Sequence, residues 1–73
     1  MTKLAHISGR AAVRAFTKFG YRYVHTSGDH AILRKPQNPT LSIPLHKEVA
    51  PYLLKSQLKK AGIDVEEFLK VVK

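Results

Sequence analysis

The sequence YRYVHTSGDHAILRKPQNPTLSIP (residues 21–44) predicts three successive β-strands. Aromatic and β-branched residues dominate the first two segments, and the third alternates between polar and apolar side chains. The segment TSGD (26–29) predicts a turn, and KPQNP (35–39) predicts a loop whose prolines cannot donate to a sheet. These patterns together predict a three-stranded antiparallel meander. Its strands are expected at residues 21–25, 30–34 and 40–44.

Helical patterns flank the predicted sheet on both sides. Ser8 is a candidate N-cap of a helix that Gly20 would close. A second helix is expected from Pro51 to Ala61, with Gly62 as its C-cap. Asp64 and Glu67 then have the spacing of a capping box, which opens a short C-terminal helix. The order α-β-β-β-α-α predicts an α+β two-layer sandwich that spans residues 1–73 as a single domain.

The spacing of the connections predicts which residues share each face of the sheet. With TSGD as the whole turn, Val24 lies opposite Ala31, and His25 lies opposite His30. A loop symmetric about Gln37 places Ala31 opposite Ile43. One face is then apolar and meets the helices. Its members are Val24, Ala31, Leu33, Leu41 and Ile43.

The opposite face of this predicted sheet is polar and open to solvent. Its members are Tyr21, Tyr23, His25, His30, Ile32, Arg34, Thr40 and Ser42. His46 continues the same parity just beyond the third strand, diagonal to His30. We therefore expect His25, His30 and His46 to converge at one end of this face, with the tyrosines available to stack on bases.

The chain carries 13 Lys and Arg against five Asp and Glu, a formal net charge of +8. A field of this sign attracts polyanions, which are either nucleic acids or acidic protein surfaces. The first helix contributes a basic stripe at helical spacing, and the second strand ends in two more cations. Candidate phosphate contacts are therefore Arg10, Arg14, Lys18, Arg34 and Lys35. No apolar run approaches the ~20 residues that cross a bilayer, so a cytoplasmic protein without a membrane partner is expected.

A histidine on an exposed basic surface can move protons near neutral pH. RNA cleavage needs a base for the 2′-hydroxyl, an acid for the leaving oxygen, and cations for the charged phosphorane, so neither a metal nor another cofactor is expected. A metal site made by His25, His30 and His46 is the competing chemistry. Two further classes remain open: a non-catalytic RNA-binding module, and a protein-interaction domain that meets an acidic partner.

Three segments of the chain resemble the HicA toxins of bacterial and archaeal HicA–HicB toxin–antitoxin modules. They are FGYRYVHTSGDHAILRKP (19–36), LSIPLHKEVAP (41–51) and LLKSQLKKAGIDVEEFL (53–69). The strongest features are a glycine-x-histidine turn that opens the second strand, a Pro-x-His after the third strand, and the leucine-rich C-terminal pattern. The resemblance implies a fold like that of a double-stranded-RNA-binding domain.

The resemblance also implies an activity and a partner. The activity is that of an mRNA interferase, a ribonuclease that cleaves mRNA and blocks translation, and the partner is a HicB antitoxin that covers the active histidine. The family's catalytic histidine corresponds to His30 and its turn glycine to Gly28. Asp29 stands where many members have serine, so this carboxylate either orients His30 or repels the substrate phosphate. The Pro-x-His histidine corresponds to His46, and His25 is a further supporting candidate.

Overall fold

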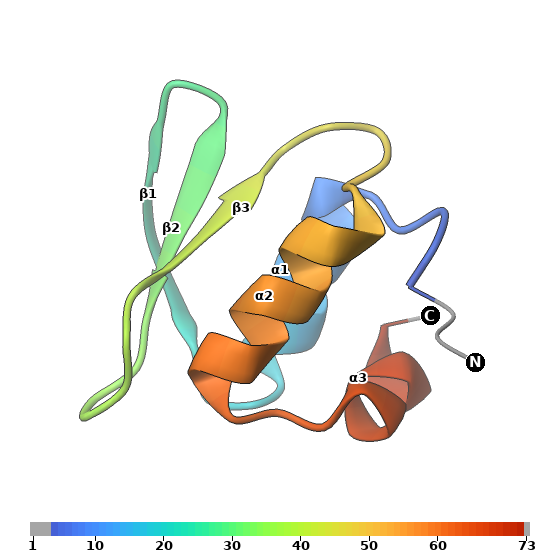
Figure 1. Cartoon of the computed structure of the whole chain (residues 1–73). Coiled ribbons are helices and arrows are strands. Elements are labelled where there is room, and N and C mark those ends of the chain that lie inside the picture. The colour runs from blue at the N-terminus through green and yellow to red at the C-terminus, as the bar shows by residue number, and fades with distance from the viewer. Residues whose placement is uncertain (1–3, 73) are drawn as a thin grey trace.

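The computed structural model describes residues 4–72 and contains three helices and three strands (Figure 1). They follow the order α1(Gly9–Thr17), β1(Arg22–Ser27), β2(His30–Arg34), β3(Leu41–Pro44), α2(Pro51–Ala61) and α3(Val65–Val71). The strands form one antiparallel sheet in the order β1-β2-β3. The α+β fold class and the element order predicted from the sequence are therefore confirmed.

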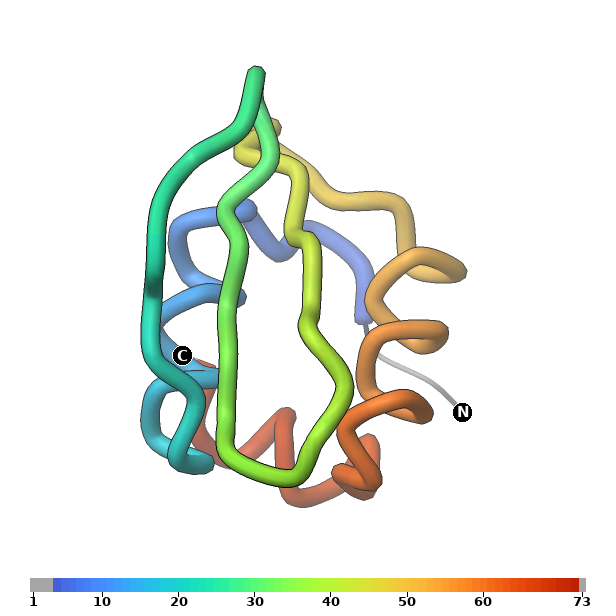
Figure 2. Tube along the Cα trace, turned by 90° about the vertical axis from the view of Figure 1, so that its left-hand side faces the viewer, coloured from blue at the N-terminus to red at the C-terminus, as the bar shows by residue number. Residues whose placement is uncertain are grey.

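The helices cover one face of the sheet and leave the other face bare. Figure 1 shows α1 and α2 on the same side of the strands, and Figure 2 looks onto the bare face with the helices behind it. The core lies between the layers, where Leu33, Leu41 and Ile43 meet Phe16 and Leu54. Each such side chain contributes about 1.5–3 kcal/mol when it leaves water. This core stabilises the fold and leaves the opposite sheet face available for other contacts.

The helix boundaries follow most of the predicted capping signals. Ser8 caps α1, since its side chain accepts a hydrogen bond from the Ala11 backbone N–H. Gly62 closes α2 with a φ of +71°, as expected for a left-handed C-cap. Gly20 is not the C-cap of α1, because the helix ends at Thr17 and Gly20 belongs to the turn that follows. Asp64 occupies the N-cap of α3 but makes no capping hydrogen bond, so the predicted capping box does not form.

The register between β2 and β3 is the predicted one. Ala31 pairs with Ile43, and Leu33 pairs with Leu41. All four side chains are buried, which confirms that they form the apolar face. The β2–β3 loop therefore has the length that was expected for a loop symmetric about Gln37.

The predicted register between β1 and β2 is wrong. The turn is two residues long, so Ser27 pairs with His30 and Thr26 pairs with Ala31. A bulge at Val24 then shifts the pairing once more, because Tyr23 pairs with Leu33 while His25 pairs with Ile32. The extra residue turns Tyr23 to the helix side of the sheet and leaves Val24 41% exposed rather than in the core.

The bare face is called the open face below. Its strand members are Arg22, His25, Ser27, His30, Ile32, Arg34, Ser42 and Pro44. Neither tyrosine predicted for this face belongs to it: Tyr23 pairs on the helix side, and Tyr21 lies before β1 and is only 3% exposed. The Tyr21 hydroxyl donates to the Pro39 carbonyl, and burial raises the pKa of this phenol. The open face is therefore lined by histidines and arginines rather than by aromatic rings.

Candidate active site

The β1–β2 turn brings its polar residues to one end of the sheet. Gly28 and Asp29 alone connect the strands, and Gly28 has a φ of +63°. A positive φ at the first central position is the requirement of a type II′ turn, which glycine meets without steric cost. The turn therefore projects Asp29 at its tip and starts β2 at His30.

Asp29 bridges two histidines. Its Oδ1 lies 2.8 Å from Nδ1 of His30, and its Oδ2 lies 3.0 Å from Nε2 of His46. The three side chains are about half exposed, with fractions of 61%, 46% and 54% for Asp29, His30 and His46. One carboxylate thus orients two imidazoles at a surface that a large substrate can reach.

His46 reaches Asp29 because backbone hydrogen bonds hold the segment after β3 against both the β1–β2 turn and the start of α1. The Leu45 backbone N–H donates to the Asp29 carbonyl at 2.7 Å, and the Gly9 N–H donates to the His46 carbonyl at 2.9 Å. Gly9 is buried against this segment, where an added Cβ would lie 2.2 Å from the Pro44 carbonyl oxygen. The N-terminus of α1, the turn and the segment after β3 therefore form one junction under the site.

The contacts with Asp29 select the imidazole tautomers. A neutral His30 that donates from Nδ1 keeps the lone pair on Nε2 free to take a proton. His46 donates from Nε2, which leaves its Nδ1 on the far side of the ring. An imidazole held by a carboxylate with its second nitrogen exposed is the arrangement of a general acid–base group.

The two histidines hold the pKa of Asp29 below its ordinary value of 3.8. The hydrogen bond from His46 is the largest cause, and the charge and hydrogen bond of His30 add to it. Asp29 is therefore an anion throughout the neutral range.

This lowered pKa makes stability depend on pH in a defined direction. A carboxyl whose folded pKa is depressed stabilises the fold above its unfolded pKa, and this contribution is lost as the pH falls through the folded pKa. We expect the parent to be more stable than Asp29→Asn above the pKa of an unfolded aspartate, and the difference to shrink as the pH falls through the lowered folded pKa. Urea denaturation at several pH values measures it, and a difference that stays constant over this range would contradict the assignment.

His25 does not join this cluster. It lies on the open face beside Ile32, but within residues 4–72 its side chain makes no hydrogen bond or ion pair. The convergence predicted for three histidines therefore holds for His30 and His46 only. No three metal-ligating side chains in the described part of the chain are arranged to hold a metal ion, so the alternative three-histidine metal site does not form.

The predicted phosphate contacts lie on two different surfaces. Arg10 and Arg14 of α1 line a groove of about 380 Å³ on the helix side, together with Tyr23 and Leu45. Lys18 is exposed at the end of α1. Arg34 lies on the open face, whereas the neighbouring Lys35 points to the helix side and donates to the Phe19 carbonyl at 2.8 Å. The ammonium of Lys35 thus has a structural contact that the sequence did not indicate.

The sequence interpretation missed two residues that shape this surface. Gly9 was not singled out. Most other residues favour a helix more than glycine does, so a glycine just after a helix N-cap indicates that another backbone segment lies close to it. Arg22 was not recognised as a partner of Arg34, since their pairing depends on the bulge at Val24. No local pattern in residues 21–25 indicates this bulge.

Two comparisons with known proteins bear on the identity of the chain. A family model described as the HicA toxin of bacterial toxin–antitoxin systems matches residues 9–63, which include the turn, both histidines of the Asp29 bridge and α2. A search of curated proteins finds no match. Among residues 4–72, no helix has the length and apolar character that crossing a membrane requires.

Proposed function

The chain belongs to the HicA toxin family of bacterial toxin–antitoxin modules, and from this membership we propose that it is an endoribonuclease that cleaves mRNA and blocks translation. His30 is its general acid–base residue. The observation that carries the proposal is the 2.8 Å contact between Asp29 and Nδ1 of His30 on an exposed surface of a strongly basic chain. The proposed place of action is the cytoplasm, where mRNA is translated.

The proposed reaction is an internal transfer of the phosphodiester. Nε2 of His30 takes the proton of the 2′-hydroxyl, and the 2′-oxygen attacks the adjacent phosphorus. The bond from phosphorus to the 5′-oxygen breaks, and the leaving oxygen receives a proton. In this proposal a protonated His46, held by the same carboxylate through Nε2, supplies that proton from Nδ1 and becomes neutral, while His30 becomes the imidazolium. The products are a 2′,3′-cyclic phosphate and a free 5′-hydroxyl, so no water or cofactor is consumed.

Cations support the proposed binding of RNA. The net charge of +8 attracts a polyanion, and the arginines of α1 and β2 are exposed. Arg10, Arg14, Lys18 and Arg34 are the proposed phosphate contacts. Lys35 contributes charge to the same region while its ammonium stays bound to the Phe19 carbonyl.

The experiment is RNA cleavage by the purified chain in the presence and absence of EDTA. Because the proposed acid–base chemistry uses protein groups alone, we expect equal rates in both samples and products that end in 2′,3′-cyclic phosphate. Cleavage that stops in EDTA would reveal a metal-dependent nuclease, and RNA binding without cleavage would identify a non-catalytic RNA-binding module. Either result would contradict the proposed reaction.

The family implies an antitoxin partner, and we propose a HicB-type protein that covers the Asp29–His30–His46 cluster. This cluster is exposed in the free chain, so a partner can block it by contact alone. The partner is expected to stop RNA cleavage when it is mixed with the toxin in a stoichiometric amount. Titration of the cleavage assay with the purified partner measures this inhibition.

A further inference from the structure

Two arginines face each other across the strands at the end of the open face opposite the turn. Arg22 pairs directly with Arg34, and like charges in this arrangement destabilise a sheet. No carboxylate among residues 4–72 forms an ion pair with either arginine. The ion pairs in this part of the chain join Glu48 to His6, Asp29 to its two histidines, and Glu67 to Lys70. An anion bound at this end of the open face would offset the two positive charges.

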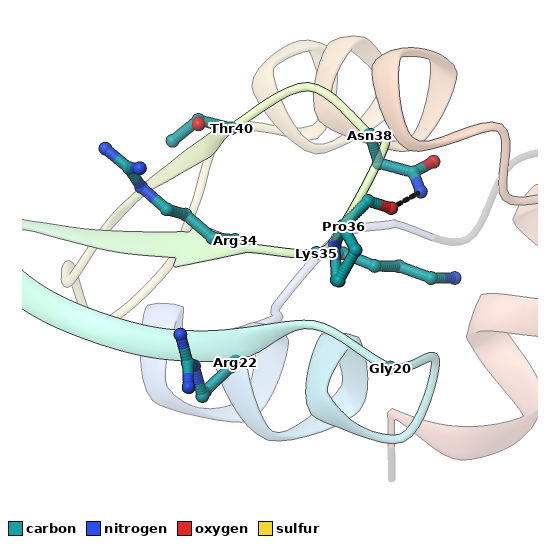
Figure 3. Close-up of a pocket in the computed structure, with 7 residues that line it drawn as sticks. All are labelled: Gly20, Arg22, Arg34, Lys35, Pro36, Asn38 and Thr40. Atoms are coloured by element: carbon teal, nitrogen blue, oxygen red, sulfur yellow. Dashed lines mark hydrogen bonds between the residues drawn. The ribbon is translucent and has the colours of Figure 1, made fainter.

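The structure forms an open pocket at this arginine pair. Its volume is about 530 Å³, and its lining contains no acidic side chain. The lining residues are Gly20, Arg22, Arg34, Lys35, Pro36, Asn38 and Thr40. In Figure 3, Arg34 extends toward Thr40 on the β2–β3 loop, while Lys35 points in the opposite direction. Guanidinium groups bind the oxygens of phosphate through paired N–H donors, so the pocket has the chemistry of a phosphate site.

The pocket and the candidate active site lie on the same surface but at opposite ends of β2. Arg34 and His30 both project from β2 onto the open face. They are four positions apart, which corresponds to about 13 Å at roughly 3.3 Å per residue. Figure 2 shows the turn and the β2–β3 loop at opposite ends of the sheet. One phosphate cannot touch both residues, so an RNA that is cleaved at His30 would place a different phosphate at the arginine pair.

Resting on the proposed ribonuclease function, we propose that Arg22 and Arg34 together bind one backbone phosphate of the RNA away from the cleaved bond. The RNA strand then runs along the open face from the β1–β2 turn to the β2–β3 loop. This site binds the substrate and takes no part in proton transfer.

The test measures the affinity of a short fluorescein-labelled single-stranded RNA for variants made in a His30→Ala background, where the RNA stays intact. Arg22→Gln and Arg34→Gln are each expected to weaken binding about tenfold, the typical value of one charge-assisted contact. Because both arginines hold the same phosphate, the double variant should fall well short of a hundredfold loss. The slope of log affinity against log salt should decrease by about one.

The matched control is Lys55→Gln, which removes one positive charge from an exposed position of α2 on the helix layer. It is expected to change affinity far less than either arginine variant. The melting temperature gives a second readout: removing one of two facing arginines should leave it unchanged or raise it, whereas a purely structural role would lower it. In the His30-containing chain, the arginine variants should raise KM and leave kcat unchanged.

The outcomes separate this site from the proposed activity. Arginine variants that bind RNA as tightly as the parent overturn the phosphate site even if the chain cleaves RNA. Loss of affinity in the arginine variants supports the site even if the parent shows no cleavage. Unchanged RNA affinity together with lost antitoxin binding would overturn the proposal and assign the pair to an acidic protein segment.

Discussion

Replacing His30 with alanine is expected to abolish RNA cleavage and toxicity while the fold is retained. General acid–base catalysis by a positioned side chain contributes about 10²–10⁴-fold, so the rate should fall by at least that range. His30 lies on the open face with 46% of its side chain exposed, and its ion pair with Asp29 is a surface contact that contributes little to stability. Gel analysis of RNA cleavage measures the first effect, and thermal denaturation checks the second.

His25→Ala is the matched control for His30→Ala. It removes the same imidazole from the same face of the sheet, but His25 has no contact with Asp29 within the described residues. This variant should keep most of the parent rate. If His30→Ala cleaves RNA at the parent rate, or if both histidine variants lose activity equally, the assignment of His30 is wrong.

Gly9→Ala is expected to lower both stability and activity, against the usual effect of this substitution in a helix. Alanine within a helix is normally more favourable than glycine by about 0.8–1 kcal/mol. Here the new Cβ would lie 2.2 Å from the Pro44 carbonyl oxygen and 2.7 Å from the Leu45 Cα, which are backbone atoms that cannot rotate away. Overpacking of this kind costs about 1–3 kcal/mol. The segment that carries His46 must therefore shift.

Gly62→Ala is the matched control for stability. An added Cβ at Gly62 meets no atom within 4 Å, so the cost is that of its positive φ, about 1–2 kcal/mol. The two variants should lose comparable stability by urea denaturation, but only Gly9→Ala should slow RNA cleavage, because only Gly9 contacts the His46 segment. A Gly9→Ala protein as stable and as active as the parent would show that this close approach is not needed.

The two strand connections differ in how well the sequence predicts them. The loop between β2 and β3 is bounded by prolines that exclude strand pairing on both sides, so its length and register could be inferred. The turn at Gly28 could be recognised, but its length could not be inferred, because TSGD is compatible with both a two-residue and a four-residue connection. The prediction chose the longer one, and the pairing of β1 moved by two positions.

The same difference explains what was predicted of the candidate site. His30 and Gly28 could be singled out because a glycine turn followed by a histidine is a local pattern, and the family resemblance assigned it a role. The bridge from Asp29 to His46 joins residues that are 17 positions apart. The prediction brought His46 near His30 by strand parity, but it left open whether Asp29 orients His30 or repels substrate. The contacts support orientation, since one carboxylate oxygen accepts a hydrogen bond from His46 and the other lies 2.8 Å from Nδ1 of His30.

Local sequence is sufficient for the helices, the strands and the apolar face of β2 and β3 in this protein. Their signals are the spacing of apolar side chains, the N-cap at Ser8 and the C-cap at Gly62, which act within a few residues of one another. Tertiary structure alone decides which polar groups meet. The bulge at Val24 brings Arg22 opposite Arg34, and the close approach at Gly9 holds His46 where Asp29 can bind it. Both depend on backbone contacts between segments that are distant in the chain, and such contacts leave no periodic pattern in the sequence.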